Sequence, residues 1–235
     1  MYEYGTMVHI YGQAELIDAT DLEGVRPVKQ SRGRRTLDKL LAAGLRLVAA
    51  REFDSMLVAD IARAADCSVG AFYLRFRDKD AFFRALIAHY VAESRDTAVA
   101  LFEQHKDDRL INALVVATGE RFRRMGGLLR SAIRKRMEDP TIWDPIRENG
   151  HFIATGFIEW LAARQGRALS DDEEMRARFA FQVLYGTLNN ALVNAPASFS
   201  RDFPSPSLSR SPQDFFSVSS TAGLRLKISN MRRSR

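Results

Sequence analysis

Three side chains whose hydrogen-bonding chemistry suits nucleic acid lie close together in the first third of the chain. They are the phenol of Tyr73, the guanidinium of Arg75 and the ammonium group of Lys79. Such groups donate hydrogen bonds to phosphate oxygens and to acceptors on base edges in the major groove. We therefore expect nucleic-acid contact here, provided that one element presents these side chains on a common surface.

The stretch Val58–Lys79 predicts such an element, because it is typical of two short helices joined by a tight turn. Small and apolar residues recur at helical spacing in its first half. Ser68 is a good N-cap for a second helix over about 69–76, whose buried face carries Phe72 and Phe76. Two helices joined by a turn of this length form a helix-turn-helix, whose second helix can enter a major groove.

The residues left on the outer face of the second helix have distinct uses at a DNA surface. Gly70 lets the backbone come close to DNA. Ala71 and Leu74 can touch thymine methyl groups, while Tyr73 and Arg75 can bond phosphate or base edges.

The run DIARAADCSVGAFYLRFRDKDAFFRAL resembles the TetR family of bacterial transcription regulators. The shared pattern is Asp-Ile-Ala, a small turn, Ser-x-Gly, an aromatic pair, a second aromatic residue and Lys-Asp, and the resemblance extends over residues 34–87. The chain departs from it at Met56 and Leu57, where the family has Thr or Ser, at Ala59, where a basic residue is common, and at Arg75, where an aromatic residue or His is common.

The resemblance implies an all-α protein with an N-terminal three-helix helix-turn-helix domain and a C-terminal helical ligand-binding and dimerisation domain. It implies a homodimer that binds a palindromic double-stranded DNA operator, and a repressor that a small-molecule effector releases. The DNA-binding residues that we expect are Arg34, Arg35, Ser68, Val69, Gly70, Ala71, Tyr73, Leu74, Arg75 and Lys79.

A basic arm, residues 29–35, comes directly before the first predicted helix and can lie along phosphates. Thr36 is a candidate cap for that helix, and apolar residues recur along it every three or four positions. Ser55 is a candidate cap for the first helix of the helix-turn-helix, because Met56 and Leu57 replace the Thr or Ser that the family has there.

Charge and composition predict four segments. Residues 1–30 match no family pattern and are expected to be a flexible extension. Residues 31–79 form the DNA-binding domain, and residues 26–79 carry 12 Lys and Arg against 6 Asp and Glu. Residues 80–195 form the regulatory and dimerisation domain, with 16 charges of each sign. Residues 196–235 are rich in Ser and basic, which predicts a disordered tail.

The predicted body is helical throughout. A long helix over about 79–104 is capped by Asp78, and Ser170 with Glu173 has the spacing of a capping box that opens the last helix. The last two helices resemble the family's dimerisation pair, in which Gly186 can allow close approach of a second helix. Packing of Gly186 inside one subunit is the alternative.

The effector site is expected between the middle helices and the long helix, as the resemblance implies. Candidate lining residues are Phe102, Phe122, Met125, Trp143 and Phe152. This set predicts an apolar or aromatic effector, although an apolar stripe of this kind more often belongs to an ordinary core.

Other functional classes find little support. The chain has no secretory signal pattern, no apolar run of membrane-spanning length and a single Cys, which predicts a cytoplasmic protein. No nucleotide-binding loop or hydrolase motif is present, so we expect no cofactor, no metal and no catalysis. The alternatives are a constitutive DNA-binding protein without an effector, a helical interaction protein without DNA contact, and a small metal-dependent enzyme that uses His89 and Glu93.

Overall fold

The structure is a computed structural model that describes residues 23–26 and 31–194. Residues 1–22, 27–30 and 195–235, with the predicted tail and most of the predicted extension, lie outside the described residues. The described residues belong to one compact unit and are helical, with no strand among them, which confirms the all-α prediction. The α-helices are α2 (Ser31–Ala50), α3 (Val58–Ala64), α4 (Val69–Tyr73), α5 (Lys79–Gln104), α6 (Arg109–Arg124), α7 (Gly126–Lys135), α8 (Asp144–Gln165) and α9 (Asp171–Asn194). Two short 3-10 helices, η1 (Phe53–Ser55) and η2 (Pro140–Ile142), complete the fold.

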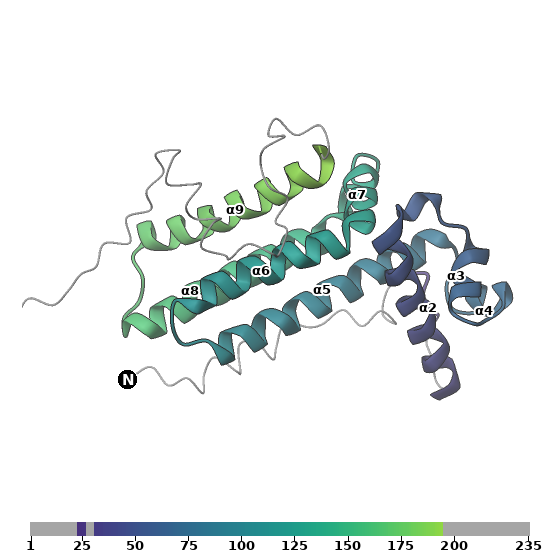
Figure 1. The fold of residues 1–235 in the computed structure, drawn as a ribbon, viewed down its shortest axis with the longest axis horizontal. Coiled ribbons are helices and arrows are strands. Elements are labelled where there is room, and N and C mark those ends of the chain that lie inside the picture. Colours follow the sequence, from purple (N-terminus) through teal and green to yellow (C-terminus); the bar gives the residue numbers. More distant parts are fainter. Residues whose placement is uncertain (1–22, 27–30, 195–235) are drawn as a thin grey trace, which may run out of the picture. The chain divides into compact units, whose positions relative to one another are not determined.

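Helices α2, α3 and α4 form a three-helix head, and α5 to α9 form the body (Figure 1). The predicted apolar stripe of α2 is buried, with Leu37, Leu41 and Val48 no more than 5% exposed. Because α2 begins at Ser31, Thr36 lies within the helix and the prediction that it caps the helix is wrong. The predicted basic arm from Ser31 onward is likewise helical, because these residues form the first turns of α2.

The two helices of the helix-turn-helix are capped in different ways. Ser68 caps α4 as predicted, since its Oγ accepts a hydrogen bond from the Ala71 N–H at 3.1 Å. Ser55 does not cap α3, because its hydroxyl donates to the Glu52 carbonyl. The carboxylate of Asp60 takes that role by accepting from the Leu57 N–H at 3.4 Å. A side chain inside the helix thus replaces the hydroxyl that the sequence lacks.

A short segment before the head, residues 23–26, packs against the residues that follow α4. The Arg26 N–H donates to the Arg75 carbonyl and the Arg77 N–H donates to the Gly24 carbonyl, both at 2.8 Å. Val25 is 7% exposed and joins the core. These bonds flank an isolated bridge between Val25 and Phe76, and α4 ends at Tyr73 rather than near residue 76.

The body is built along α5, which lies beside α8 (Figure 1). The bounds of α5 confirm the predicted long helix, and Asp78 caps it by accepting from the Ala81 N–H at 2.7 Å. Ser170 and Glu173 form the predicted capping box before α9. None of the helices in the described ranges combines the length and apolar character needed to cross a membrane.

Two apolar cores fill the molecule. The proximal core extends from the head into the near half of the body and includes Phe72, Phe82, Phe122 and Leu128. The distal core is smaller and lies at the far end of the body. Its buried members are Ala98, Phe102, Leu110, Leu114, Ile153 and Trp160.

Helix α7 packs onto the head so closely that only glycine fits at the contact. A Cβ atom added to Gly127 would lie 2.3 Å from the Arg51 carbonyl oxygen and 2.4 Å from that of Val48. Backbone atoms cannot rotate away as a flexible side chain can. The body and the C-terminal end of α2 are therefore in direct backbone contact.

Replacing Gly127 by Ala is expected to lower the free energy of unfolding by about 1–3 kcal/mol, because overpacking forces the helices apart. Gly119 in α6 is the matched control, since an added Cβ meets nothing within 4 Å. Its replacement by Ala should leave stability unchanged or raise it by up to about 1 kcal/mol through helix propensity. Urea unfolding measures both changes, and equal effects at the two sites would contradict the proposed contact.

Candidate nucleic-acid interface

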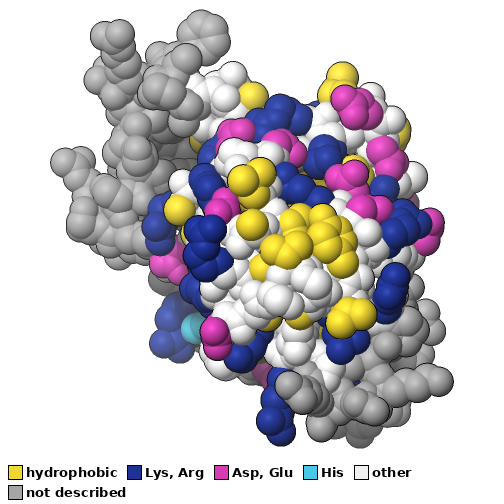
Figure 2. All heavy atoms as spheres, turned by 90° about the vertical axis from the view of Figure 1, so that its right-hand side faces the viewer, with side chains coloured by type: hydrophobic (Ala, Val, Ile, Leu, Met, Phe, Trp, Pro, Cys, Tyr) yellow, Lys and Arg dark blue, Asp and Glu magenta, His cyan; other side chains and the backbone are white. Residues whose placement is uncertain are grey.

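The outer face of α4 is unusually apolar for a solvent-exposed helix. Val69, Tyr73 and Leu74 are 42%, 46% and 59% exposed. Figure 2, which looks toward the end of the molecule that carries the head, shows an apolar patch with Lys and Arg side chains around it. Asp and Glu side chains also lie around this patch. An apolar surface with cations nearby suits a major groove, where thymine methyl groups lie between two phosphate backbones.

The opposite face of α4 is fixed by aromatic packing. Phe72 and Phe76 are fully buried, and their rings lie 5.2 Å and 4.9 Å from the ring of Phe82 in α5. Burial of these rings orients the five-residue helix, which is too short to be stable alone. The exposed side chains therefore point outward because the aromatic ones are held inward.

Gly70 has no structural need to be glycine. An added Cβ would meet only the Ser68 Oγ, at 3.7 Å, which is an ordinary contact distance. The absence of a side chain at this exposed position therefore leaves room for something outside the protein, as close approach to DNA would require.

The basic candidates are placed differently from one another. Arg34 and Arg35 are exposed in the first turns of α2. Arg75 is half-buried, and its Nε lies buried without a partner among the described residues. Lys79 donates to the Asp54 carbonyl at 3.0 Å and lies 4.9 Å from the centre of the Phe53 ring. Burial lowers the pKa of Lys79. A phosphate would thus compete with an internal contact at Lys79.

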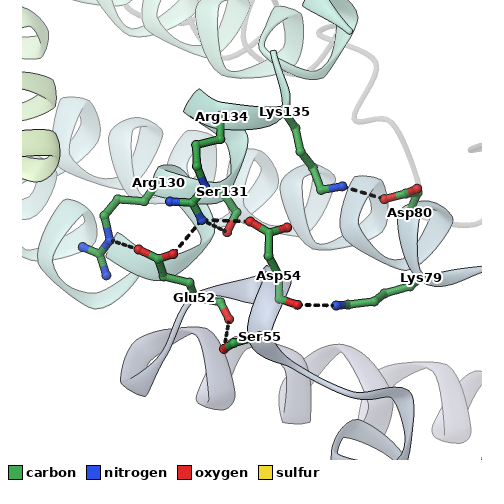
Figure 3. A network of polar contacts seen from close by, with 9 residues as sticks. All are labelled: Glu52, Asp54, Ser55, Lys79, Asp80, Arg130, Ser131, Arg134 and Lys135. Atoms are coloured by element: carbon green, nitrogen blue, oxygen red, sulfur yellow. Dashed lines mark hydrogen bonds and ion pairs between the residues drawn. The ribbon is translucent and has the colours of Figure 1, made fainter. Parts of the chain in front are cut away.

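An ion-pair cluster that the sequence did not predict joins the head to α7 (Figure 3). We call Glu52, Asp54, Arg130 and Arg134 the head–body cluster. Glu52 bonds Arg130 at 3.0 Å and Arg134 at 2.6 Å, and Arg134 also bonds Asp54 at 2.8 Å. The paired residues are 78–82 positions apart in the chain, so no local pattern could have identified them.

The head–body cluster lowers the pKa of both of its carboxyl groups. The hydrogen bond from Arg134 is the main cause at Glu52. At Asp54, burial acts in the opposite direction, but hydrogen bonds from Arg134 and Ser131 outweigh it. The hydrogen bond from Lys79 of α5 also reaches η1, because its acceptor is the Asp54 carbonyl. The segment just before α3 is thus held by both α5 and α7.

The predicted effector residues do not come together in one place. Phe122 and Met125 are buried in the proximal core, with half-buried Trp143 packed against it. Phe102 belongs to the distal core, against which Phe152 packs. The apolar residues of this set therefore line two separate cores, and their role in ligand binding stays a prediction.

His89 and Glu93, the alternative metal pair, differ in their surroundings. His89 is exposed, and Glu93 forms an ion pair with Arg124. Across residues 23–26 and 31–194, no group of three His, Cys, Asp or Glu side chains could hold a metal ion.

Comparison with known proteins agrees with this geometry. Residues 40–86, which span α2 to the start of α5, match the family described as bacterial regulatory proteins, tetR family. No curated protein matches the chain significantly.

Solved structures with the same fold extend the similarity to the body. A protein described as a TetR-family transcriptional regulator from Mesorhizobium loti has a TM-score of 0.60 at 15% identity, covering 82% of this chain and 95% of that one. A TetR-family regulator from Streptomyces coelicolor gives 0.56 at 17% identity, with 79% and 83% covered. A transcriptional regulator from Aquifex aeolicus gives 0.51 at 16% identity, with 78% and 99% covered. At these identities the likeness establishes the fold alone.

Replacing Gly70 by Ala should weaken binding to duplex DNA about tenfold while leaving the melting temperature unchanged or slightly raised. The added methyl group occupies space outside the protein and clashes with nothing inside it. Fluorescence anisotropy with promoter fragments and thermal unfolding measure the two effects. Gly119→Ala serves as the control, and equal DNA affinity of both variants would contradict the assignment of this face.

Replacing Arg134 by Ala should destabilise the protein at neutral pH by about 1 kcal/mol or less, because half-exposed ion pairs are screened by solvent. Carboxyl groups with a lowered pKa stabilise the fold above their ordinary pKa values, which are 4.5 for Glu52 and 3.8 for Asp54. That contribution is lost as the pH falls through the lowered values.

The difference between the wild type and the Arg134→Ala variant should therefore shrink as the pH drops from 5 to about 3. Urea unfolding across this range measures it, with Arg123→Ala, an exposed position on α6, as control. A difference that stays constant with pH would show that the cluster does not form.

Proposed function

We propose that the protein is a transcriptional repressor, because residues 40–86 match the tetR family of bacterial regulatory proteins and the described chain shares its fold with a TetR-family regulator. It binds a palindromic operator as a homodimer and is released by a small-molecule effector. The observation that carries the proposal is the exposed apolar face of α4, held outward by buried Phe72 and Phe76. Such a protein acts in the cytoplasm, where its DNA lies.

In this proposal α4 reads base edges while the start of α2 contacts phosphate. Val69, Ala71 and Leu74 meet thymine methyl groups, and Tyr73 bonds base edges or the backbone. Arg34 and Arg35 bind phosphate from the exposed first turns of α2, close to the amino end of that helix. Ser68 caps α4 and so keeps its amino end facing the groove.

The surface of α9 supports a dimer formed through the last two helices. One face of α9 exposes four large apolar side chains to solvent, which is unfavourable. They are Met175 (62% exposed), Phe179 (62%), Val183 (48%) and Val193 (53%). Gly186 lies on the same helix and has no atom within 4 Å of an added Cβ. A mid-helix glycine costs about 1 kcal/mol, and packing within this subunit gives nothing in return. Close approach of a second copy would account for both features.

The contacts between head and body support control by a ligand. At Gly127 the backbone of α7 contacts the backbone of α2. The ion pairs of the head–body cluster connect α7 to the segment before α3. A ligand that shifts α7 would therefore shift the head. In a dimer, such shifts change the distance between the two copies of α4, which must match successive major grooves about 34–36 Å apart. By linkage, DNA then weakens ligand binding by the same factor.

The test of DNA binding is a titration with duplexes that carry the inverted repeat of the neighbouring promoter. The wild type should bind in a salt-dependent way, and Tyr73→Ala should weaken binding about tenfold. The slope of log K against log salt should become shallower in Arg34→Ala and in Arg35→Ala. The expected change is about one unit for each phosphate contact that is lost in a half-site.

Arg123→Ala, on exposed α6, is the control and should bind like the wild type. Indifference of the wild type to every promoter fragment, with no salt dependence, would contradict the proposal and favour an interaction protein without DNA contact.

The test of assembly is Phe179→Asp, which places a charge in the middle of the apolar face of α9. We expect the wild type to sediment as a dimer and this variant as a monomer, because a buried unpaired charge costs several kcal/mol. Met137→Asp is the matched control, since Met137 is 80% exposed and lies outside α9. A Phe179→Asp protein that remains dimeric would place the interface elsewhere.

A further inference from the structure

A polar layer lies between the two apolar cores of the body. Along α5, Tyr90 belongs to the proximal core and Ala98 to the distal core, and Ser94 lies between them. Helix α6 runs the other way, so Leu114 belongs to the distal core and Phe122 to the proximal core. Arg121 directly precedes Phe122. The side chains that form the layer are Ser94 and Thr97 on α5, Arg121 on α6 and Asn149 on α8.

Arg121 is a buried cation that forms no ion pair with another described residue, although the charge of Glu93 acts on it from nearby. It is 7% exposed, and its Nη2 donates to the hydroxyl of Thr97 at 2.8 Å. Its Nε is buried and has no hydrogen-bond partner, and no carboxylate of residues 23–26 or 31–194 forms an ion pair with it. The nearby acid, Glu93, is paired with Arg124 instead. A neutral hydroxyl cannot repay the cost of desolvating a guanidinium.

Asn149 is a second buried group with an unmet hydrogen bond. It is 3% exposed, and its Nδ2 donates to the Ser94 Oγ at 3.0 Å while its Oδ1 has no partner. Whichever way the amide is turned, one of its two polar atoms lacks a partner. On α9, the Oδ1 of Asn189 is likewise buried without a partner.

Two tyrosines stand beside the cation. Arg121 interacts electrostatically with both Tyr90 and Tyr185. Burial raises the pKa of Tyr90, and it raises the pKa of Tyr185 to about 12. Both phenols are therefore neutral hydrogen-bond donors rather than counterions to Arg121. The ring of Tyr185 lies 6.1 Å from that of Phe122 and 6.4 Å from that of Phe181, so apolar groups flank the layer on both sides.

We propose that this layer is the recognition element of the effector site and binds a small organic carboxylate with an apolar body. The carboxylate takes the free donors of Arg121, a hydroxyl or N–H of the ligand donates to Asn149, and the apolar part packs against the aromatic flanks. The inference rests on the proposed function for its biological role. It changes the expected effector from a purely apolar or aromatic molecule to an anion.

The charge of the occupant follows from the charge of the site. Water can satisfy the Nε of Arg121 and the amide of Asn149, but it gives the buried guanidinium no directly paired negative charge. A carboxylate satisfies both hydrogen bonding and charge, and hydrogen bonds between ionised partners are about twice as strong as neutral ones. Guanidinium also matches carboxylate geometry better than any other side chain does.

The experiment uses the full chain and two probe pairs, in each of which a carboxylate is compared with the neutral carboxamide of the same carbon skeleton. Sodium phenylacetate and sodium hexanoate are compared with phenylacetamide and hexanamide at millimolar concentration, by thermal shift and calorimetry. The carboxylates should raise the Tm of the wild type by about 2 °C or more, and the neutral amides should not. Arg121→Met should weaken carboxylate binding about tenfold or more. Arg123→Met, on the exposed side of the same helix, should bind like the wild type.

A second readout needs no ligand. Arg121→Met removes an unpaired buried charge, so the variant should unfold at the same temperature as the wild type or higher. A lower Tm would mean that Arg121 serves the fold, and this would overturn the proposal. Carboxylates that shift nothing, amides that shift the wild type equally, or undiminished binding by Arg121→Met would overturn it as well. Binding of a promoter fragment without probe is measured in parallel, so a failure of the DNA-binding proposal is seen separately.

Discussion

The burial of two phenylalanine rings beneath α4 is the interaction on which the rest of the molecule depends. Phe72 and Phe76 pack on Phe82 at the start of α5, and Phe53 of η1 packs 4.7 Å from Phe83 on the next position of the same helix. A five-residue helix has almost no stability of its own. These rings give it one orientation and point the remaining side chains outward, so apolar packing on one face of α4 fixes the face that we propose for DNA contact.

The same aromatic cluster makes the head inseparable from the long helix. Because α5 begins inside the head core and continues along the body beside α8, motion of the body has a rigid path to α4. The second link is α7, which touches the α2 backbone at Gly127 and holds Glu52 and Asp54 through its arginines. Two unlike contacts, one of close packing and one of charge, thus join the two parts. The packing contact is insensitive to salt, and the ion pairs are not.

The body itself combines two apolar cores with a costly polar layer between them. Apolar residues in place of Arg121 and Asn149 would fill this space with less desolvation. Among the described residues, the buried guanidinium has a hydrogen bond to Thr97 alone, which costs stability and suits the anion binding that we propose. The apolar face of α9 presents a similar case on the surface, where four large side chains are exposed beside a glycine with open space around it. The proposed ligand would account for the first feature, and the proposed dimer for the second.

The sequence by itself determined what depends on neighbouring residues. The bounds of α5, the caps at Ser68 and Asp78, the capping box of Ser170 and Glu173 and the inward pair Phe72 and Phe76 all follow from spacing over one or two turns. It was less reliable where a distant segment intervened. Helix α4 ends early because residues 24–26 bridge to residues 75–77, and Thr36 lies inside α2 because that helix begins at Ser31.

Only the tertiary structure decided which groups meet across the chain. It brought Glu52 to Arg134 over 82 positions, pressed Gly127 onto carbonyl oxygens of residues 48 and 51, and buried Arg121 without a counterion. It also placed in two separate cores the apolar residues that the family resemblance had grouped into one effector site. Helical periodicity gives the face on which a side chain lies but not what that face packs against, and burial, pKa and pairing all depend on the second of these.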